Sequence, residues 1–176
     1  MIATAVRPSE ALNARWDEID LGKKLWTVPP SRMKSNRKHV APLSSLALAV
    51  LERQAKVRAG GAVFPGPHSS PLNYTSFASA PRKAGVDAGT AHSWRSIFRD
   101  ACGDRLRVDR DLAEAALSHS LGGVEGAYRR ETAIEARRPV MESYANWLQR
   151  RALTSSRSRR KRKPRVPSPG RTCTGG

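Results

Sequence analysis

The sequence has few cysteines, no long apolar run and few acidic residues, and each shortage excludes a class of protein. Its two cysteines, Cys102 and Cys173, are too few for a disulfide framework, which indicates a reducing intracellular compartment. The longest apolar run, LALAVL at 46–51, is far shorter than the roughly 20 residues that a membrane span needs. The first residues, MIATAVRPSE, reach proline and charge at once, so they do not resemble a signal peptide. We therefore expect a cytoplasmic protein with no membrane partner.

Motifs for metals and nucleotides are also lacking. The chain has no glycine-rich phosphate loop ending in Lys-Ser/Thr, no CxxC and no pair of histidines at metal-ligand spacing. Its four histidines fall in four different predicted elements. We expect neither a metal ion nor any other cofactor.

What the chain has in excess is positive charge, with 32 Lys and Arg against 15 Asp and Glu. A net charge of +17 indicates an acidic partner, with nucleic acid more plausible than an anionic membrane surface. Ten of the cations and no acid lie from Arg150 onward, so the first 149 residues carry the remaining +7. The sequence predicts a folded domain at 1–151 and a disordered basic tail at 152–176.

The apolar pattern predicts a mainly helical α+β domain with a small antiparallel sheet. Strands are expected at 24–29 and 39–44, which makes a hairpin of about 24–44 with Lys34 near its tip. The predicted helices begin at Pro8 or Ser9, occupy 43–51 and 75–84, and follow a cap at Asp109 and a start at Pro139.

The predicted core consists of residues that recur at helical spacing. Three tryptophans are interpreted as part of it rather than as platforms for base stacking. The members are Trp26, Trp94, Ile97, Phe98, Ala101, Leu112, Ala113, Ala116, Leu117, Met141, Tyr144, Ala145, Trp147 and Leu148.

Cationic and hydrogen-bonding side chains stand out, each in its own short motif. They are Arg7 in TAVRPSE, Lys34 in RMKSNRKHV, His92 and Arg95 in AHSWRSIFRD, His119 in LSHSLGG and Tyr128 in AYRR. His92 and Arg95 are three residues apart and share a helix face. Taken singly, each residue has an ordinary structural explanation, such as a solvated cation, a helix-capping histidine or a packing tyrosine.

The order Arg, Lys, His-x-x-Arg, His, Tyr resembles the catalytic domain of the tyrosine recombinases, the family of phage and prophage integrases. The phrases VRPSEALNARWDEIDL, LWTVPPSRMKSNRKHVAPLS and VFPG agree with it, as does the nine-residue step from His119 to Tyr128. The resemblance extends from about Ile2 to Leu148 and implies packed helices with a small sheet.

The resemblance also implies a role for each residue. Tyr128 is the nucleophile that forms a 3′-phosphotyrosyl ester, and Arg7 and Arg95 grip the non-bridging oxygens of the phosphate. His92 is the base, and His119 donates a hydrogen bond to the phosphate. Lys34 protonates the leaving 5′-oxygen, although Arg32, Arg37 and Lys38 lie nearby in sequence. Glu10 is expected to orient Arg7.

The family further implies double-stranded DNA with attachment sites as the partner, and a homotetramer on two synapsed duplexes. Because integrases carry a core-binding domain before this point, we expect a truncated catalytic domain without that domain. Two alternatives stay open. One is a type IB topoisomerase, which uses the same tyrosine ester, and the other is a catalytically inactive DNA-binding remnant of a decayed integrase.

Overall fold

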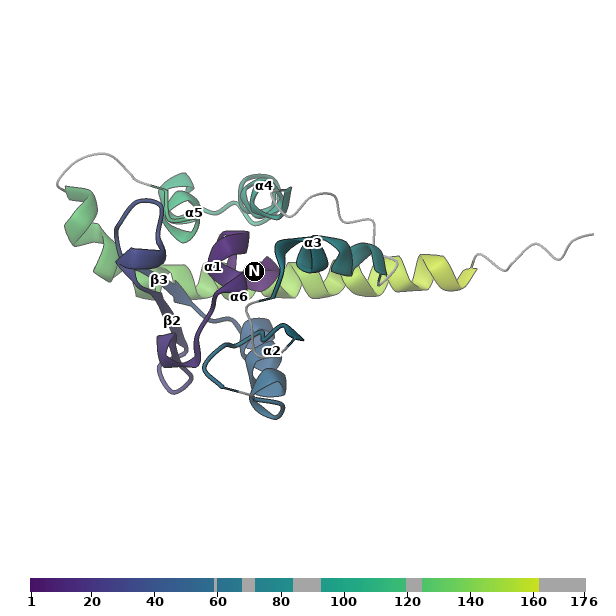
Figure 1. Ribbon diagram of the computed structural model, residues 1–176. Helices are drawn as coiled ribbons and strands as arrows, with labels where there is room; N and C mark the ends of the chain where they lie inside the picture. The colour runs from purple at the N-terminus through teal and green to yellow at the C-terminus, as the bar shows by residue number, and fades with distance from the viewer. Residues whose placement is uncertain (59, 68–71, 84–92, 120–124, 162–176) are drawn as a thin grey trace, which may run out of the picture.

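The computed structural model describes residues 1–58, 60–67, 72–83, 93–119 and 125–161, with the backbone alone at 80–83, 125–132 and 153–161. One long helix, α6 (Glu125–Lys161), runs along the whole arrangement (Figure 1). Its neighbours include α2 (Ser45–Ala55), α5 (Arg110–Ala116), strand β3 (His39–Pro42) and the 3₁₀ turn η1 (Ile2–Thr4). Within the described ranges, no helix combines the length and apolar character needed to cross a bilayer.

The sheet has three antiparallel strands in the order β1 (Ile19–Asp20), β2 (Leu25–Val28) and β3 (His39–Pro42). The predicted hairpin is confirmed, with Trp26 opposite Ala41 and Val28 opposite His39. Burial alternates along β2 because successive side chains point to opposite faces. Strand β1 was not predicted, because two residues are too few to show an alternation of apolar and polar side chains.

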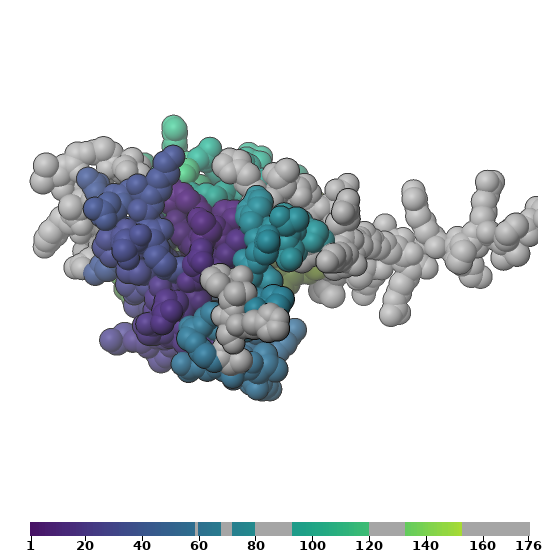
Figure 2. All heavy atoms as spheres, viewed as in Figure 1, coloured from purple at the N-terminus to yellow at the C-terminus, as the bar shows by residue number. Residues whose placement is uncertain are grey.

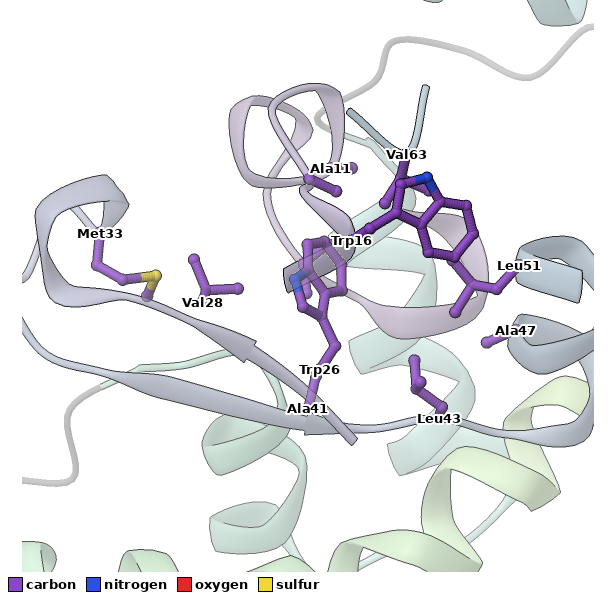
Figure 3. Packing of buried hydrophobic residues seen from close by; sticks show 12 residues of the cluster. Ala11, Trp16, Trp26, Val28, Met33, Ala41, Leu43, Ala47, Leu51 and Val63 are labelled. Atoms are coloured by element: carbon purple, nitrogen blue, oxygen red, sulfur yellow. The ribbon is translucent and has the colours of Figure 1, made fainter. Parts of the chain in front are cut away.

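The first part of the core packs around this sheet. Figure 3 shows Trp16 and Trp26 among smaller apolar side chains from the strands and from α2. Trp26 is 4% exposed and Val28 is fully buried, so the prediction that Trp26 is a core residue is confirmed. Burial of each large apolar side chain contributes roughly 1.5–3 kcal/mol, so this cluster fixes the hairpin to the body.

The second part of the core joins α4 (Ser93–Asp100) and α5 to α6. The rings of Phe98 and Tyr144 meet edge to face with centroids 4.8 Å apart, and both side chains are fully buried. Asp109 caps α5 as predicted, because its carboxylate accepts hydrogen bonds from the backbone N–H groups of Asp111 and Leu112. The remaining elements are α1 (Pro8–Leu12), α3 (Tyr74–Lys83), the π-helical turn η5 (Ala101–Arg105) and the 3₁₀ turns η2 (Trp16–Glu18) and η3 (Pro30–Arg32).

The prediction that Pro139 begins a helix is wrong, because Pro139 lies inside α6. Proline has no N–H and bends a helix, and Figure 1 shows the first turns of α6 inclined to the rest. The helix also continues to Lys161, so 152–161 is helical rather than part of a disordered tail. The prediction for 162–176 lies outside the described residues.

The predicted apolar face of α4 is only partly correct. Phe98 and Ala101 are buried, whereas Trp94 and Ile97 are half-buried and line an open groove of about 1070 Å³. Trp147 and Leu148 of α6 line the same groove, and so does the buried Trp26, so all three predicted core tryptophans border it. The side chain that α4 buries beside Phe98 is instead Arg95.

Candidate functional site

Arg95 is the centre of the candidate site and is only 8% exposed. Its Nη1 donates a hydrogen bond of 2.7 Å to the carbonyl of Ala5, and its Nη2 donates to the carbonyl of Leu117. The same Nη2 lies 3.0 Å from Nε2 of His119. One guanidinium thus joins the start of the chain, α4 and the end of α5. Burial, and then the charge of Arg7, lower its pKa to about 10, so it stays charged at neutral pH.

Arg7 stands at the N-terminus of α1, where Pro8 occupies the first helical position. Its backbone N–H donates to Oε2 of Glu10 at 2.8 Å, and its Nη1 donates to Oε1 at 2.9 Å. The Glu10 side chain is 2% exposed and that of Arg7 is 27% exposed. The carboxylate therefore holds Arg7 from inside the protein, in line with the orienting role expected of Glu10.

His119 is placed by the turn that ends α5. Ser118 has a positive φ of 55°, its N–H donates to the carbonyl of Ala115, and the N–H of His119 donates to the carbonyl of Glu114. These two bonds form a Schellman motif, which reverses the chain at the helix end. The His119 side chain is turned toward α4, where it meets Arg95, rather than onto the last carbonyls of the helix.

Lys34 lies on the surface, in the loop between β2 and β3. It makes no hydrogen bond or ion pair within the described part of the chain, and nothing brings it into contact with Arg7, Arg95 or His119. Arg32, by contrast, is tied to the body, because it donates to the carbonyl of Asn13 and to the carboxylate of Glu18. Figure 2 shows this loop, at about 30–40, on the same face as the purple N-terminal residues.

The side chains of the other two predicted residues, His92 and Tyr128, are outside the described part of the structure. His92 lies outside the described residues. Tyr128 lies in the first turns of α6, and its side chain is outside the described part. The structure therefore brings together Arg7, Arg95 and His119 and leaves the relation of Lys34, His92 and Tyr128 to them as a prediction.

Two buried basic residues beside this group were not predicted. His39 of β3 is 6% exposed, and its Nε2 has no hydrogen-bond partner among the described residues. Arg137 of α6 is 4% exposed and donates to the carbonyls of Ala133 and Ala115. Burial, followed by the charges of Arg137, Arg95 and Arg7, lowers the pKa of His39 to about 3. In the sequence His39 ends a run of basic residues, which concealed its inward position.

His39 makes the stability of the fold depend on pH. In the unfolded chain it binds a proton near pH 6.5, and in the folded protein only near pH 3. Between these values the unfolded state binds more protons, so the free energy of unfolding falls as pH falls, by about 1.4 kcal/mol per unit. When the pH falls from about 6.5 to 5, we expect the free energy of unfolding of His39→Gln to decrease by about 2 kcal/mol less than that of the wild type. Urea unfolding at the two pH values measures this, and equal losses in both proteins would contradict it.

The arrangement suits an anion that carries oxygen acceptors. Arg95 contacts His119, and Arg7 is near enough for its charge to act on Arg95. The side chains of Arg7 and His119 are partly exposed and thus open to a ligand. Guanidinium forks match the spacing of phosphate oxygens and keep their charge when partly buried. Within the described ranges, no group of three His, Cys, Asp or Glu side chains is placed to hold a metal ion. The arrangement of these side chains is of the kind that suits phosphate.

Comparison with known proteins identifies the family. The model of the phage integrase family matches residues 1–133. The chain is 39% identical over 151 residues to the prophage integrase IntA of Escherichia coli K12, a match that covers 82% of the chain and 36% of IntA. It is 32% identical over 167 residues to the integrase of Enterobacteria phage P4, covering 84% of the chain and 38% of that integrase. The chain belongs to the phage integrase family, and it spans well under half the length of these relatives.

Solved structures agree on the fold. The XerA recombinase superposes with a TM-score of 0.56 at 16% identity, over 74% of this chain and 54% of that one. The Tn1549 transposon integrase, solved in complex with a circular intermediate DNA, gives a TM-score of 0.51 at 10% identity, over 74% and 55% of the two chains. The prediction of a mainly helical recombinase fold with a small antiparallel sheet is confirmed.

Proposed function

We propose that residues 1–151 are the catalytic domain of a site-specific DNA recombinase that cuts and rejoins strands without loss of bond energy. The observation that carries this proposal is the contact of Arg95 with His119, beside Arg7, in a chain of the phage integrase family. The proposed substrate is double-stranded DNA containing attachment sites, and the proposed working assembly is a homotetramer on two duplexes, in the cytoplasm. Residues 152–176 are proposed to form a basic extension to this domain.

In the proposed reaction, the hydroxyl oxygen of Tyr128 attacks the phosphorus of the DNA backbone. The bond from phosphorus to the 5′-oxygen breaks, and the phosphate is kept as a 3′-phosphotyrosyl ester. The hydroxyl proton passes to His92, and the leaving 5′-oxygen takes a proton from Lys34. The freed 5′-hydroxyl of a second strand later reverses the step, so no external energy source is needed.

Arg7, Arg95 and His119 act on the charge that grows during this step. The two arginines bind the non-bridging oxygens, and His119 donates a hydrogen bond to one of them. Donors that are already in place before reaction cost no reorganisation, and each is typically worth 10²–10³ in rate. The backbone carbonyls that hold Arg95 supply this preorganisation. The alternatives of a topoisomerase and of an inactive remnant gain no support from the relatives named above, which are integrases.

Formation of a covalent adduct tests the proposal. The protein is mixed with a pool of duplexes of random sequence, each nicked so that the fragment released by cleavage diffuses away and religation stops. We expect a band of protein joined to DNA that survives denaturation and disappears on protease treatment. Absence of this band over a range of protein and salt concentrations would contradict the proposal.

The basic extension should add affinity for DNA that does not depend on sequence. Deletion of 162–176 removes four cations, Arg162, Lys163, Arg165 and Arg171, and leaves the described part of α6 intact. Each lost phosphate contact should reduce the slope of log K against log salt by roughly 0.9. A full-length variant with these four residues changed to glutamine separates charge from length. Unchanged slopes, measured by fluorescence anisotropy, would show that residues 162–176 do not contact DNA.

A further inference from the structure

Glu114 lies behind His119 and has no part in the reaction described above. It is in α5, its side chain is 15% exposed, and it sits between two cationic partners. Its Oε2 contacts Nδ1 of His119, and its Oε1 forms an ion pair with Nε of Arg99, with 3.0 Å between the two atoms. Glu114 and His119 are five residues apart, and the Schellman turn at Ser118 brings the two side chains together.

These contacts fix where the proton of the imidazole lies. A carboxylate can only accept, so Nδ1 must carry a proton that it donates to Glu114. Arg99 Nη2 is 3.4 Å from the same nitrogen, but a nitrogen that donates to the carboxylate cannot also accept from a guanidinium. The other nitrogen, Nε2, faces Nη2 of Arg95, which can only donate. In this arrangement Nδ1 of His119 donates to Glu114, and Nε2 accepts from Arg95.

A phosphate oxygen changes this requirement, because it too can only accept. For His119 to donate to it, Nε2 must gain a proton and the ring must become an imidazolium. The charged groups that face the ring are Arg95 and Arg99 from α4 and Glu114 from α5, and Arg110 acts on Glu114 in turn. The two arginines oppose a third positive charge, and Glu114 is the anion among them that offsets it.

We propose that Glu114 is a positioning residue, which holds the ring of His119, keeps a proton on Nδ1 and stabilises the imidazolium that donates to the phosphate. This inference rests on the proposed function of His119. Although burial acts most strongly on Glu114 and alone would raise its pKa, the hydrogen bond from His119 and the charge of Arg99 hold that pKa below its usual value. The carboxylate is thus ionised at neutral pH, as the role requires.

Nuclear magnetic resonance of the histidine rings tests the proton position without DNA. We expect the ring nitrogens of His119, assigned by the loss of their signals in His119→Gln, to show protonation on Nδ1 at slightly alkaline pH. Free imidazole side chains favour the other nitrogen, so this signature reports the contact. Glu114→Gln keeps an acceptor and should keep the signature, and Glu114→Ala should lose it. A wild-type ring protonated on Nε2 would overturn the proposal, whether or not the protein cleaves DNA.

Rates of adduct formation test the effect on chemistry. Glu114→Ala should slow the adduct by about 10- to 100-fold, the range found when the partner behind a metal-ligating histidine is lost. Glu114→Gln should fall between Glu114→Ala and the wild type, because it orients the ring without the charge. Glu135→Gln is the matched control, since Glu135 also pairs with an arginine, Arg138, but on the exposed surface of α6. Equal rates in Glu114→Ala and the wild type would overturn the proposal.

The two proposals fail in different ways. A wild type that forms no adduct but shows the Nδ1 signature contradicts the recombinase activity and leaves the assignment of Glu114 to His119 intact. Thermal unfolding of each variant shows whether it is folded. If Glu114→Ala does not fold, the nearly isosteric Glu114→Gln decides, and a Glu114→Gln rate equal to that of the wild type then overturns the role of the charge.

Discussion

Tyr128→Phe abolishes the covalent adduct and leaves DNA binding unchanged, if Tyr128 is the nucleophile. The substitution removes one oxygen and keeps the ring, so contacts of the cationic surface with phosphates persist. Without that oxygen there is no atom to hold the phosphate as an ester. Loss of a nucleophile costs up to about 10⁶ in rate in a well-studied hydrolase, so the adduct should fall below detection. Denaturing gels with nicked duplexes measure the adduct, and anisotropy measures binding.

The other two tyrosines serve as matched controls. Tyr74 is 52% exposed on α3, and Tyr144 is fully buried against Phe98 and Trp147. Burial raises the pKa of Tyr144, and its hydroxyl has no hydrogen-bond partner among the described residues, so it cannot reach DNA. Tyr74→Phe and Tyr144→Phe should both form the adduct at the wild-type rate. An adduct that persists in Tyr128→Phe would identify a different nucleophile and contradict the assignment.

The sequence predicted those features that depend on short-range signals. The hairpin followed from two runs of alternating residues, and the start of α5 followed from Asp109, whose side chain caps its own helix. Arg95 is a residue for which short-range signals were not sufficient. Its place in the helix was predictable, but its burial depends on the carbonyls of Ala5 and Leu117, which are 90 and 22 residues away. A local pattern contains no information about such distant partners.

A turn and a helix start were missed for a related reason. A left-handed residue at the end of a helix is usually glycine, and here Ser118 takes that conformation, so nothing in the sequence marked the turn that places His119. Pro139 gave the opposite error, because proline favours the first turn of a helix, yet α6 continues through it. The contacts of α5 and β3 with α6 compensate for the lost hydrogen bond. Tertiary contacts decided both cases.

Arg95→Lys should slow adduct formation by about 10²–10³, although it keeps the positive charge. The guanidinium holds the carbonyls of Ala5 and Leu117 with two separate nitrogens while it faces His119. An ammonium is a single point of donation, so it cannot satisfy both carbonyls and also present a fork to a phosphate. A pre-steady-state time course of adduct formation at saturating protein measures the rate of the chemical step.

The effect on chemistry must be separated from an effect on folding, because a buried carbonyl left without a donor costs about 1–3 kcal/mol. Arg137→Lys is the matched control. Arg137 is also a buried arginine that donates to two backbone carbonyls, those of Ala133 and Ala115, but it does not contact His119. The two variants should lose similar stability in urea, and Arg95→Lys alone should lose the adduct. If both variants form the adduct at the same rate, Arg95 stabilises the fold and does not bind the phosphate. The proposed binding of the non-bridging oxygens by Arg7 and Arg95 would then be wrong.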